Sequence, residues 1–112
     1  AYYMYQLYRS WGDVVFTEEP SLGFEVGKLA KAATPAAEIF EQVKKDIESS
    51  LSYFGSDYTI KEKKSLWSKA ATLMLKADVY LWSAHRDGGE GDARTAKNAL
   101  TYRIISAVAI WT

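Results

Sequence analysis

The sequence predicts an all-α fold built from paired helices, and three observations support this prediction. Residues 67–82 are apolar on nearly every side of a helix of about four turns, which indicates a helix packed between other helices. Residues 35–53 place apolar side chains on one helical face and charged side chains on the other. A glycine-rich stretch at residues 85–92 separates two helical patterns, as in an αα-hairpin.

Length and composition are those of one globular domain. The chain has 112 residues, of which 48% are hydrophobic and 25% are charged. Fourteen acidic residues balance fourteen basic ones, so no overall field favours nucleic acid or an anionic membrane as a partner. The chain has no cysteine, which excludes disulfides, thiolate metal sites and a cysteine nucleophile within it. No apolar run approaches the ~20 residues of a membrane-spanning helix.

The first predicted helix covers residues 1–11. Aromatic and aliphatic side chains point all round this helix, which is unusual for an exposed terminus, and no capping residue precedes it. Residues 101–112 likewise end within an apolar helical pattern that has no Gly or Asn cap. We therefore expect the chain to be an excerpt from a larger protein.

Residues 12–34 predict an irregular segment. Gly12 and Asp13 signal a turn, and Pro20 and two further glycines interrupt any regular period. A loop of this length in a compact domain is usually functional or packed over neighbouring structure. Four apolar residues favour packing over a mobile loop, namely Leu22, Phe24, Val26 and Leu29.

The second predicted helix covers residues 35–53. Thr34 is a favourable N-cap, and Pro35 suits the first helical position because its missing N–H is not needed there. Gly55 marks the end of the helix. The apolar face is predicted to consist of Ala36, Ile39, Phe40, Val43, Ile47 and Leu51.

The third predicted helix covers residues 68–84 and follows a polar connector at residues 55–66. Its polar residues fall within about 60° of one another and are predicted to form a narrow stripe facing water, whereas its leucines are predicted to be shielded. The stripe comprises Lys69, Thr72, Lys76 and Ser83, and the leucines are Leu73, Leu75 and Leu81. The lysines of the connector are predicted to be solvated rather than to bind nucleic acid, namely Lys61, Lys63 and Lys64.

The fourth predicted helix covers residues 92–110. The glycines and acidic residues of 85–92 are predicted to end the preceding helix, and Asp92 is predicted to cap the new one. Small residues on both helices allow their axes to approach closely, namely Ala70, Ala71, Ala77, Ala93, Ala96 and Ala99. The inner face of the fourth helix is predicted to be Ala96, Leu100, Ile104, Ala107, Val108 and Trp111.

Candidates for catalysis or metal binding are few. His85 is the one histidine, and its place beside a glycine turn suits a helix-dipole partner or a surface residue better than a catalytic base. Residues 87–92 carry oxygen ligands but lack the spacing of a calcium-binding EF-hand. Glu18 and Glu19 are adjacent, and nothing else marks them as an acid–base pair. We predict no catalytic residue, no metal site and no cofactor.

Asp78 is the one polar residue out of place on the third predicted helix. It lies about 180° round the helix from Lys69. Because an unpaired buried carboxylate is costly, we predict that Asp78 reaches an Arg or Lys on a neighbouring helix or sits at a groove between two helices. Contact with a ligand is the alternative interpretation.

Aromatic residues make up 14% of the chain. Flat aromatic faces stack well on sugar rings, and Tyr and Trp add a polar edge. Helical aromatic residues such as Tyr80 and Trp82 more often belong to a core than to a binding platform. The composition therefore permits a saccharide-binding protein without showing one.

In the first half of the chain, an aromatic-rich helix runs into WGDVV, residues 11–15, and then into the acidic-Pro segment of residues 18–20. This arrangement resembles the helix and GDVP signature of the SusD/RagB-like nutrient-binding lipoproteins. The amphipathic helix at residues 39–51, with Asp46 in its middle, resembles the next element of the family. One departure is Val15, which stands where the family usually has Pro.

The second half carries two further motifs of this family in the same order. The Ala-rich helix of residues 67–82 ends in an aliphatic-Tyr-Leu-aromatic string, and AKNAL, residues 96–100, resembles the start of its hairpin partner. Residues 101–112 are less like the expected continuation. Four elements in the right order thus cover most of residues 1–100.

The resemblance implies part of a larger α-helical protein with tetratricopeptide-like helix pairs. It implies non-catalytic binding of an oligosaccharide or other nutrient at the cell surface, and uptake through a SusC-like TonB-dependent transporter. It also implies a surface-exposed outer-membrane lipoprotein whose lipid anchor lies outside this segment. The sugar-contacting residues of the family follow no fixed motif, so the ligand-binding residues here stay unknown. The alternatives are a tetratricopeptide-type protein–protein interaction module that holds a peptide, and a fragment of an enzyme whose catalytic residues lie elsewhere.

Overall fold

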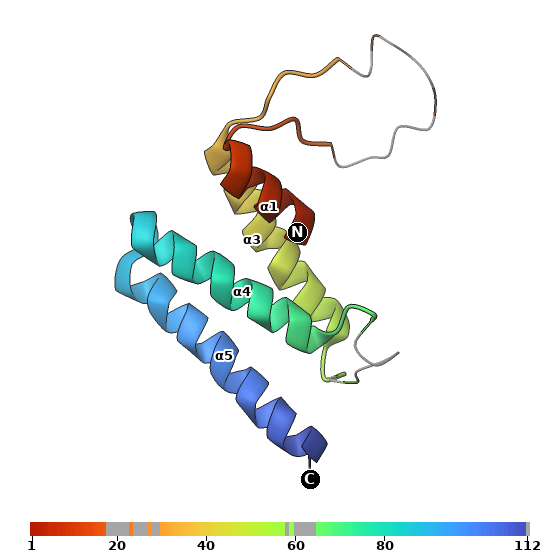
Figure 1. Ribbon diagram of the computed structural model, residues 1–112, viewed down its shortest axis with the longest axis vertical. Helices are drawn as coiled ribbons and strands as arrows, with labels where there is room; N and C mark the ends of the chain where they lie inside the picture. The colour runs from red at the N-terminus through yellow and green to blue at the C-terminus, as the bar shows by residue number, and fades with distance from the viewer. Residues whose placement is uncertain (18–22, 24–26, 28–29, 58, 60–64, 112) are drawn as a thin grey trace. The chain divides into compact units, whose positions relative to one another are not determined.

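The computed structural model describes residues 1–17, 23, 27, 30–57, 59 and 65–111, and at Asp87 and from residue 102 onward it describes the backbone alone. Among the described residues the fold is all-α, as predicted, and the single β-type contact is an isolated antiparallel bridge between Val14 and Thr34 (Figure 1). The chain divides into two compact units, Ala1–Val43 and Lys44–Thr112.

Helix α1 (Tyr2–Trp11) buries one of its aromatic faces within the first unit. Tyr5 is fully buried, and the Tyr8 ring stacks on the ring of Phe40 with centroids 4.9 Å apart. Tyr3 and Trp11 remain largely exposed, at 81% and 72% of their surface. Only part of the apolar surface of this helix is therefore buried within the unit.

Helix α3 (Ala36–Phe54) begins with a side-chain cap that the sequence did not predict. The Ala36 N–H donates to Oδ1 of Asp13 at 2.7 Å, and a carboxylate is also favoured there by the helix dipole. Thr34 lies two residues ahead of the helix and uses its N–H in the bridge to the carbonyl of Val14 at 2.9 Å. The prediction that Thr34 caps this helix is therefore wrong, because the bridge fixes Thr34 outside the cap position.

Several predictions concern residues outside the described part of the chain. These residues include the apolar side chains proposed to pack in the irregular segment, the adjacent glutamates and the connector lysines. They are Glu18, Glu19, Pro20, Leu22, Phe24, Val26, Leu29, Lys61, Lys63 and Lys64.

Helix α4 (Lys69–Ser83) begins at Ser68, whose Oγ accepts a hydrogen bond from the Ala71 N–H at 3.3 Å. Such an N-cap satisfies one of the backbone donors that every helix start leaves unpaired. Leu73 and Leu75 are buried, as predicted, with 6% and 7% of their surface exposed. Together with Val79, which is fully buried, they anchor α4 in the second unit.

The polar stripe of α4 faces α3, and the prediction that it faces water is wrong. Thr72 is 1% exposed and Ser83 is 5% exposed. The reason lies in α3, which presents a matching row of polar side chains. The pairs are Ser50 Oγ with Thr72 Oγ1 at 3.3 Å, Glu48 Oε1 with Lys76 Nζ at 2.6 Å, and Lys44 Nζ with Ser83 Oγ at 3.1 Å.

The opposite face of α4 is exposed within this chain. Met74 and Leu81 expose 45% and 60% of their surface, so the prediction of a shielded Leu81 is wrong. Asp78 lies on the same face, four residues after Met74 and three before Leu81, and is also exposed. Asp78 is therefore not buried within this chain, so the cost of burying a carboxylate does not arise, and the predicted contact with an Arg or Lys of a neighbouring helix stays a prediction.

A short π-helical turn, η2 (Ala84–Gly88), joins α4 to α5 (Gly89–Trp111), and the two helices lie side by side as a hairpin (Figure 1). Gly89 has a φ of 55°, a left-handed conformation that glycine adopts without strain. The sequence predicts a break between the helices at residues 85–92, but in the structure the second helix of the hairpin already begins at Gly89. Because α5 starts at Gly89, Asp92 lies within its first turn and does not cap it.

The core of the second unit lies where α4 meets α5. Leu73, Ala77 and Ala99 form a buried cluster, and Leu51 of α3 packs against it. Ala96 is also buried, which agrees with the predicted inner face of α5, whereas Leu100 is 46% exposed and does not belong to that face. The small alanines allow the close approach of helix axes that the sequence predicts.

Candidate ligand-binding pocket

The second unit contains a pocket of about 440 Å³ where α3, α4 and α5 converge. Its volume falls within the range of about 300–1,000 Å³ typical of small-molecule sites. Among the described lining residues, one comes from α3, three come from α4 and three come from α5. They are Leu51, Lys69, Leu73, Lys76, Thr95, Asn98 and Ala99.

The floor of the pocket is apolar. Leu51, Leu73 and Ala99 line it, and the latter two also belong to the buried cluster of the unit. Ala99 has no side chain beyond Cβ, so the α5 wall leaves space opposite Leu51 and Leu73. A small residue at this core position of α5 is compatible with the hollow.

Two lysines of α4 form one side of the rim. Lys76 Nζ contacts Glu48 Oε1 at 2.6 Å and lies 5.7 Å from the centre of the Tyr80 ring. Lys69 Nζ donates to the carbonyl oxygen of Gly55, at the C-terminal end of α3. Both ammonium groups are therefore held in place by partners on the unit itself, and the rim on this side is rich in donors.

Two polar side chains of α5 form the other side of the rim. Thr95 Oγ1 donates to the carbonyl oxygen of Gly91 at 3.1 Å, which leaves its own lone pairs available as acceptors. Asn98, one turn later, is exposed, and within the described part of the chain its amide has no hydrogen-bond partner. An unpaired amide at a pocket rim can both donate to and accept from a ligand.

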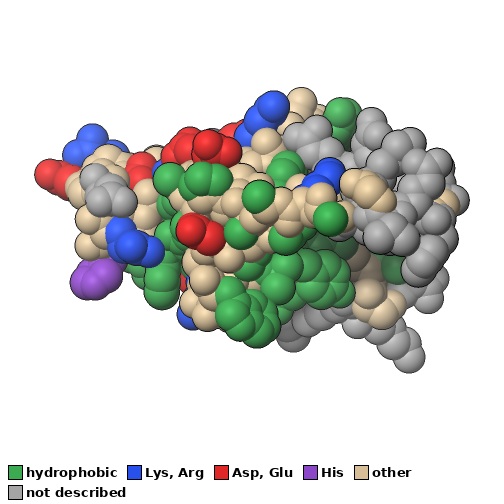
Figure 2. Space-filling view, turned by 90° about the horizontal axis from the view of Figure 1, so that it is seen from above, with side chains coloured by type: hydrophobic (Ala, Val, Ile, Leu, Met, Phe, Trp, Pro, Cys, Tyr) green, Lys and Arg blue, Asp and Glu red, His purple; other side chains and the backbone are tan. Residues whose placement is uncertain are grey.

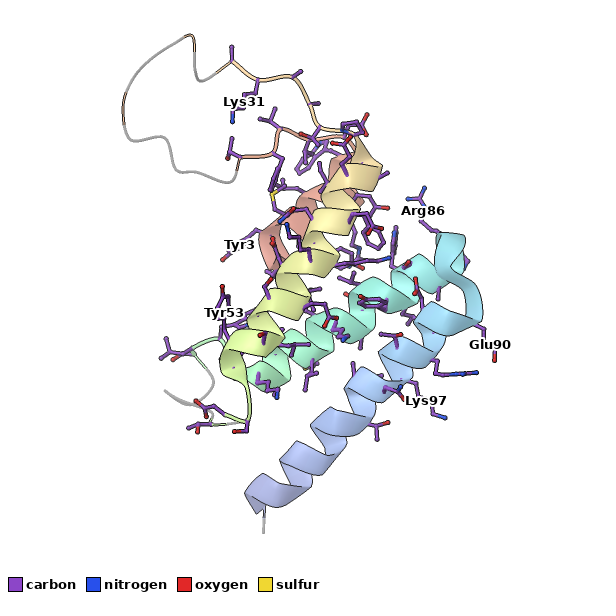
Figure 3. All side chains as sticks on the ribbon, turned by 180° about the vertical axis from the view of Figure 1, so that it is seen from behind. Tyr3, Lys31, Tyr53, Arg86, Glu90 and Lys97 are labelled. Atoms are coloured by element: carbon purple, nitrogen blue, oxygen red, sulfur yellow. The ribbon has the colours of Figure 1, made fainter. Side chains whose placement is uncertain are left out.

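None of the described residues that line the pocket is aromatic. Among the described side chains of the second unit, the most exposed rings are those of Tyr53, which points away from α3 in Figure 3, and Trp67, at 90% and 50% exposure. Trp67 Nε1 donates to Thr72 Oγ1 at 2.7 Å, so the indole is anchored to a side chain of α4. The described lining thus offers a ligand hydrogen bonds and aliphatic contacts.

A Ser–Lys–Asp cluster links the three helices at the other end of α4. Lys44 Nζ donates to Ser83 Oγ at 3.1 Å, and Ser83 Oγ donates to Asp92 Oδ2 at 2.5 Å. A serine beside a lysine can serve as a nucleophile and base, but here the hydroxyl is 5% exposed and the lysine lies 3.8 Å from a carboxylate. The cluster is a structural link between helices.

The other candidate residues lie apart from the pocket. His85 is exposed in η2, as predicted for a surface residue, and Figure 2 shows the histidine side chain at the surface. Residues 87–92 are divided between η2 and α5, and the Asp92 carboxylate is engaged by Ser83 and Lys44. The described residues include no group of three or more His, Asp or Glu that could hold a metal ion.

No described helix is both long and apolar enough to cross a membrane.

Sequence reasoning alone does not find the pocket, because the sequence pattern places Lys69 and Lys76 on a solvated stripe. One available signal was the coincidence of Ala99 with the polar pair Thr95 and Asn98 on one side of the fourth helix.

The chain matches no protein-family model. It also matches no curated protein. The chain does match solved structures. A SusD superfamily protein from Bacteroides vulgatus ATCC 8482 shares 45% identity over 88% of this chain, with a TM-score of 0.76. NanU from B. fragilis shares 44% identity over 96% of this chain, with a TM-score of 0.80.

A third match, a SusD superfamily protein from Bacteroides fragilis NCTC 9343, shares 28% identity over 99% of this chain, with a TM-score of 0.62. The chain covers 19%, 20% and 21% of these three proteins, about a fifth of each. These matches confirm the resemblance predicted from the sequence motifs. The chain therefore belongs to the SusD superfamily, as a segment of a member of it.

Proposed function

We propose that the protein containing this segment binds oligosaccharides at the cell surface without performing chemistry. It then releases them for uptake through a SusC-like TonB-dependent transporter. The observation that carries the proposal is 44–45% identity with SusD-superfamily structures over 88–96% of the chain. In this proposal residues 1–112 are part of one SusD-like helical domain that needs no metal and no cofactor.

The polar groups of the second unit are consistent with binding and not catalysis. Ser83, Lys44 and Asp92 are occupied with one another, and the serine is buried. The pocket rim offers ammonium, hydroxyl and amide groups, which are hydrogen-bonding partners suited to a polar ligand. Such a set supports a role in holding a ligand.

We further propose that the whole protein is an outer-membrane lipoprotein exposed on the cell surface. Its attachment to the membrane would come from a lipid anchor outside residues 1–112. The proposal rests on the family alone. Protection of the protein from added protease in intact cells would contradict surface exposure, and loss of the protein after protease treatment would support it.

A tetratricopeptide-type peptide-binding module is the second candidate. The observation that favours it is the pocket between paired helices, whose lysine-rich rim suits a carboxylate of an extended peptide. In this case a peptide of a partner protein, and not a glycan, would bind in the pocket between the helices.

Calorimetry on the full-length protein separates the two candidates. The titrants are maltohexaose, cellohexaose, mucin O-glycans and a control set of acidic peptides. Saturable heat with one or more glycans and none with the peptides supports the glycan proposal. Saturable heat with peptides alone supports the second candidate and contradicts the first. Co-purification of a TonB-dependent transporter with the tagged protein tests the proposed partner.

A further inference from the structure

We propose that the pocket between α3, α4 and α5 is a saccharide subsite that recognises ring hydroxyls through Asn98 and Thr95. This inference rests on the proposed glycan-binding function and adds to it a location and a mode of recognition. Residues 1–112 would then contain part of the ligand site and would not be scaffold alone.

The first argument is the state of the Asn98 side chain. It is exposed at the pocket rim, and among the described residues it has no hydrogen-bond partner. A side-chain amide offers two donors and one acceptor within a fixed plane, a geometry that fits two neighbouring hydroxyls of a sugar ring. Because the Asn98 amide is bound to no described residue, it is available to a ligand.

The second argument is the distribution of polar and apolar groups. Thr95 adds acceptor lone pairs one turn before Asn98, and Lys76 adds an ammonium donor across the pocket. Between them lies the aliphatic floor of Leu51, Leu73 and Ala99, which suits the C–H face of a pyranose. Polar groups on both sides of an apolar floor match the amphipathic shape of a sugar ring.

The third argument is that the donors are already positioned. Lys76 is held by Glu48 at 2.6 Å, and Lys69 is held by the carbonyl of Gly55. Fixed groups lose little conformational entropy when a ligand arrives, which favours binding. Four of the described lining residues carry hydrogen-bonding side chains, namely Lys69, Lys76, Thr95 and Asn98, so the loss of one of them should weaken binding measurably.

The experiment uses the full-length protein and whichever of maltohexaose, cellohexaose or mucin O-glycans gives the strongest calorimetric signal. Asn98→Ala should raise the Kd about threefold to tenfold, as expected for the loss of one or two hydrogen bonds. Asn98→Leu, which also obstructs the rim, should raise it further. The thermal midpoint of both variants should stay unchanged, because Asn98 contacts no described residue through a hydrogen bond.

Lys97→Ala is the matched control, since Lys97 is the neighbouring residue of α5, is exposed and does not line the pocket (Figure 3). It should leave the Kd unchanged. Wild-type binding with an unaltered Kd in both Asn98 variants would overturn this inference and leave the proposed function standing. A fall in thermal midpoint in both variants would also overturn it, because Asn98 would then be structural. No binding of any glycan by the wild type would contradict the proposed function itself.

Discussion

The Nζ of Lys44 on α3 donates to the Oγ of Ser83 on α4 across 3.1 Å, and the same Oγ donates to Oδ2 of Asp92 on α5. One hydroxyl therefore connects three helices. Lys44 Nζ lies 3.8 Å from Asp92 Oδ2, so the partly buried carboxylate is balanced by a cation, and the centre of the Tyr80 ring lies 5.3 Å from the same ammonium. Because Ser83 and Asp92 flank η2, these contacts hold the ends of the hairpin turn together.

Replacement of Lys44 by Met should destabilise the protein. The Asp92 side chain is 24% exposed and would lose its counter-charge, and Ser83 would lose a donor. We expect the free energy of unfolding to fall by about 1–3 kcal/mol, the range for leaving a partly buried polar group without its partner. Urea unfolding followed by circular dichroism measures this change.

Arg94→Ala provides the control for a general charge effect. Arg94 pairs with Glu90 at 3.3 Å, but both side chains are largely exposed, at 71% and 88%. Exposed pairs contribute little, so the free energy of unfolding should change by less than ~0.5 kcal/mol. Equal effects of the two substitutions would contradict the role assigned to the three-helix contact.

The helical pattern could be predicted from the sequence because it depends on local residue spacing. The apolar spacing of residues 36–51 and the all-round apolarity of residues 67–82 both correspond to helices in the structure. The length of the turn could not be predicted, since Gly89 and the π-helical turn reverse the chain in fewer residues than a loop would need. That outcome depends on the tertiary contacts of Asp92 with Ser83 and Lys44.

The orientation of α4 differs from the one that the sequence predicts, and the cause is physical. A stripe of Lys, Thr and Ser predicts solvent exposure only when no neighbouring helix offers polar partners. Here Lys44, Glu48 and Ser50 of α3 supply those partners, so the stripe turns inward and Leu81 turns outward. The sequence does not predict the pocket for the same reason, because its pattern places the side chains of Lys69 and Lys76 in solvent.

Gly88 should be intolerant of any side chain. A Cβ at this position would overlap with the Asp92 carboxylate, which is itself held by Ser83. We expect Gly88→Ala to lower the free energy of unfolding by about 1–3 kcal/mol, the usual cost of forcing an extra methyl group into a filled space. Thermal unfolding by calorimetry measures the effect.

Gly91→Ala is the matched control on the same hairpin. Gly91 lies in the first turn of α5, and a Cβ there would meet no atom within 4 Å. Alanine is the better helix former by about 1 kcal/mol, so this substitution should stabilise the protein or leave it unchanged. Destabilisation of similar size by both substitutions would contradict the steric argument for Gly88.

Leu73→Ala should be among the most destabilising single substitutions in the second unit. Leu73 is 6% exposed and belongs to the cluster that joins α4 to α5. Removing a buried leucine side chain typically costs about 2–5 kcal/mol, depending on how far the cavity collapses. The adjacent Met74 is 45% exposed, and Met74→Ala should cost less in the same urea unfolding assay. A larger effect at Met74 would show that the assigned core is wrong.

The pair of Glu48 and Lys76 should contribute a measurable coupling energy between α3 and α4. Their charged atoms are 2.6 Å apart, and the Lys76 side chain is only 18% exposed. A double-mutant cycle with Glu48→Gln and Lys76→Met should give a coupling of about 0.5–1 kcal/mol, because Glu48 is half exposed and solvent screens the pair. In 1 M salt the Debye length falls to about 3 Å, so the coupling should decrease but not vanish at this short separation. A coupling of zero at low salt would contradict the contact and with it the inward orientation of the polar face of α4.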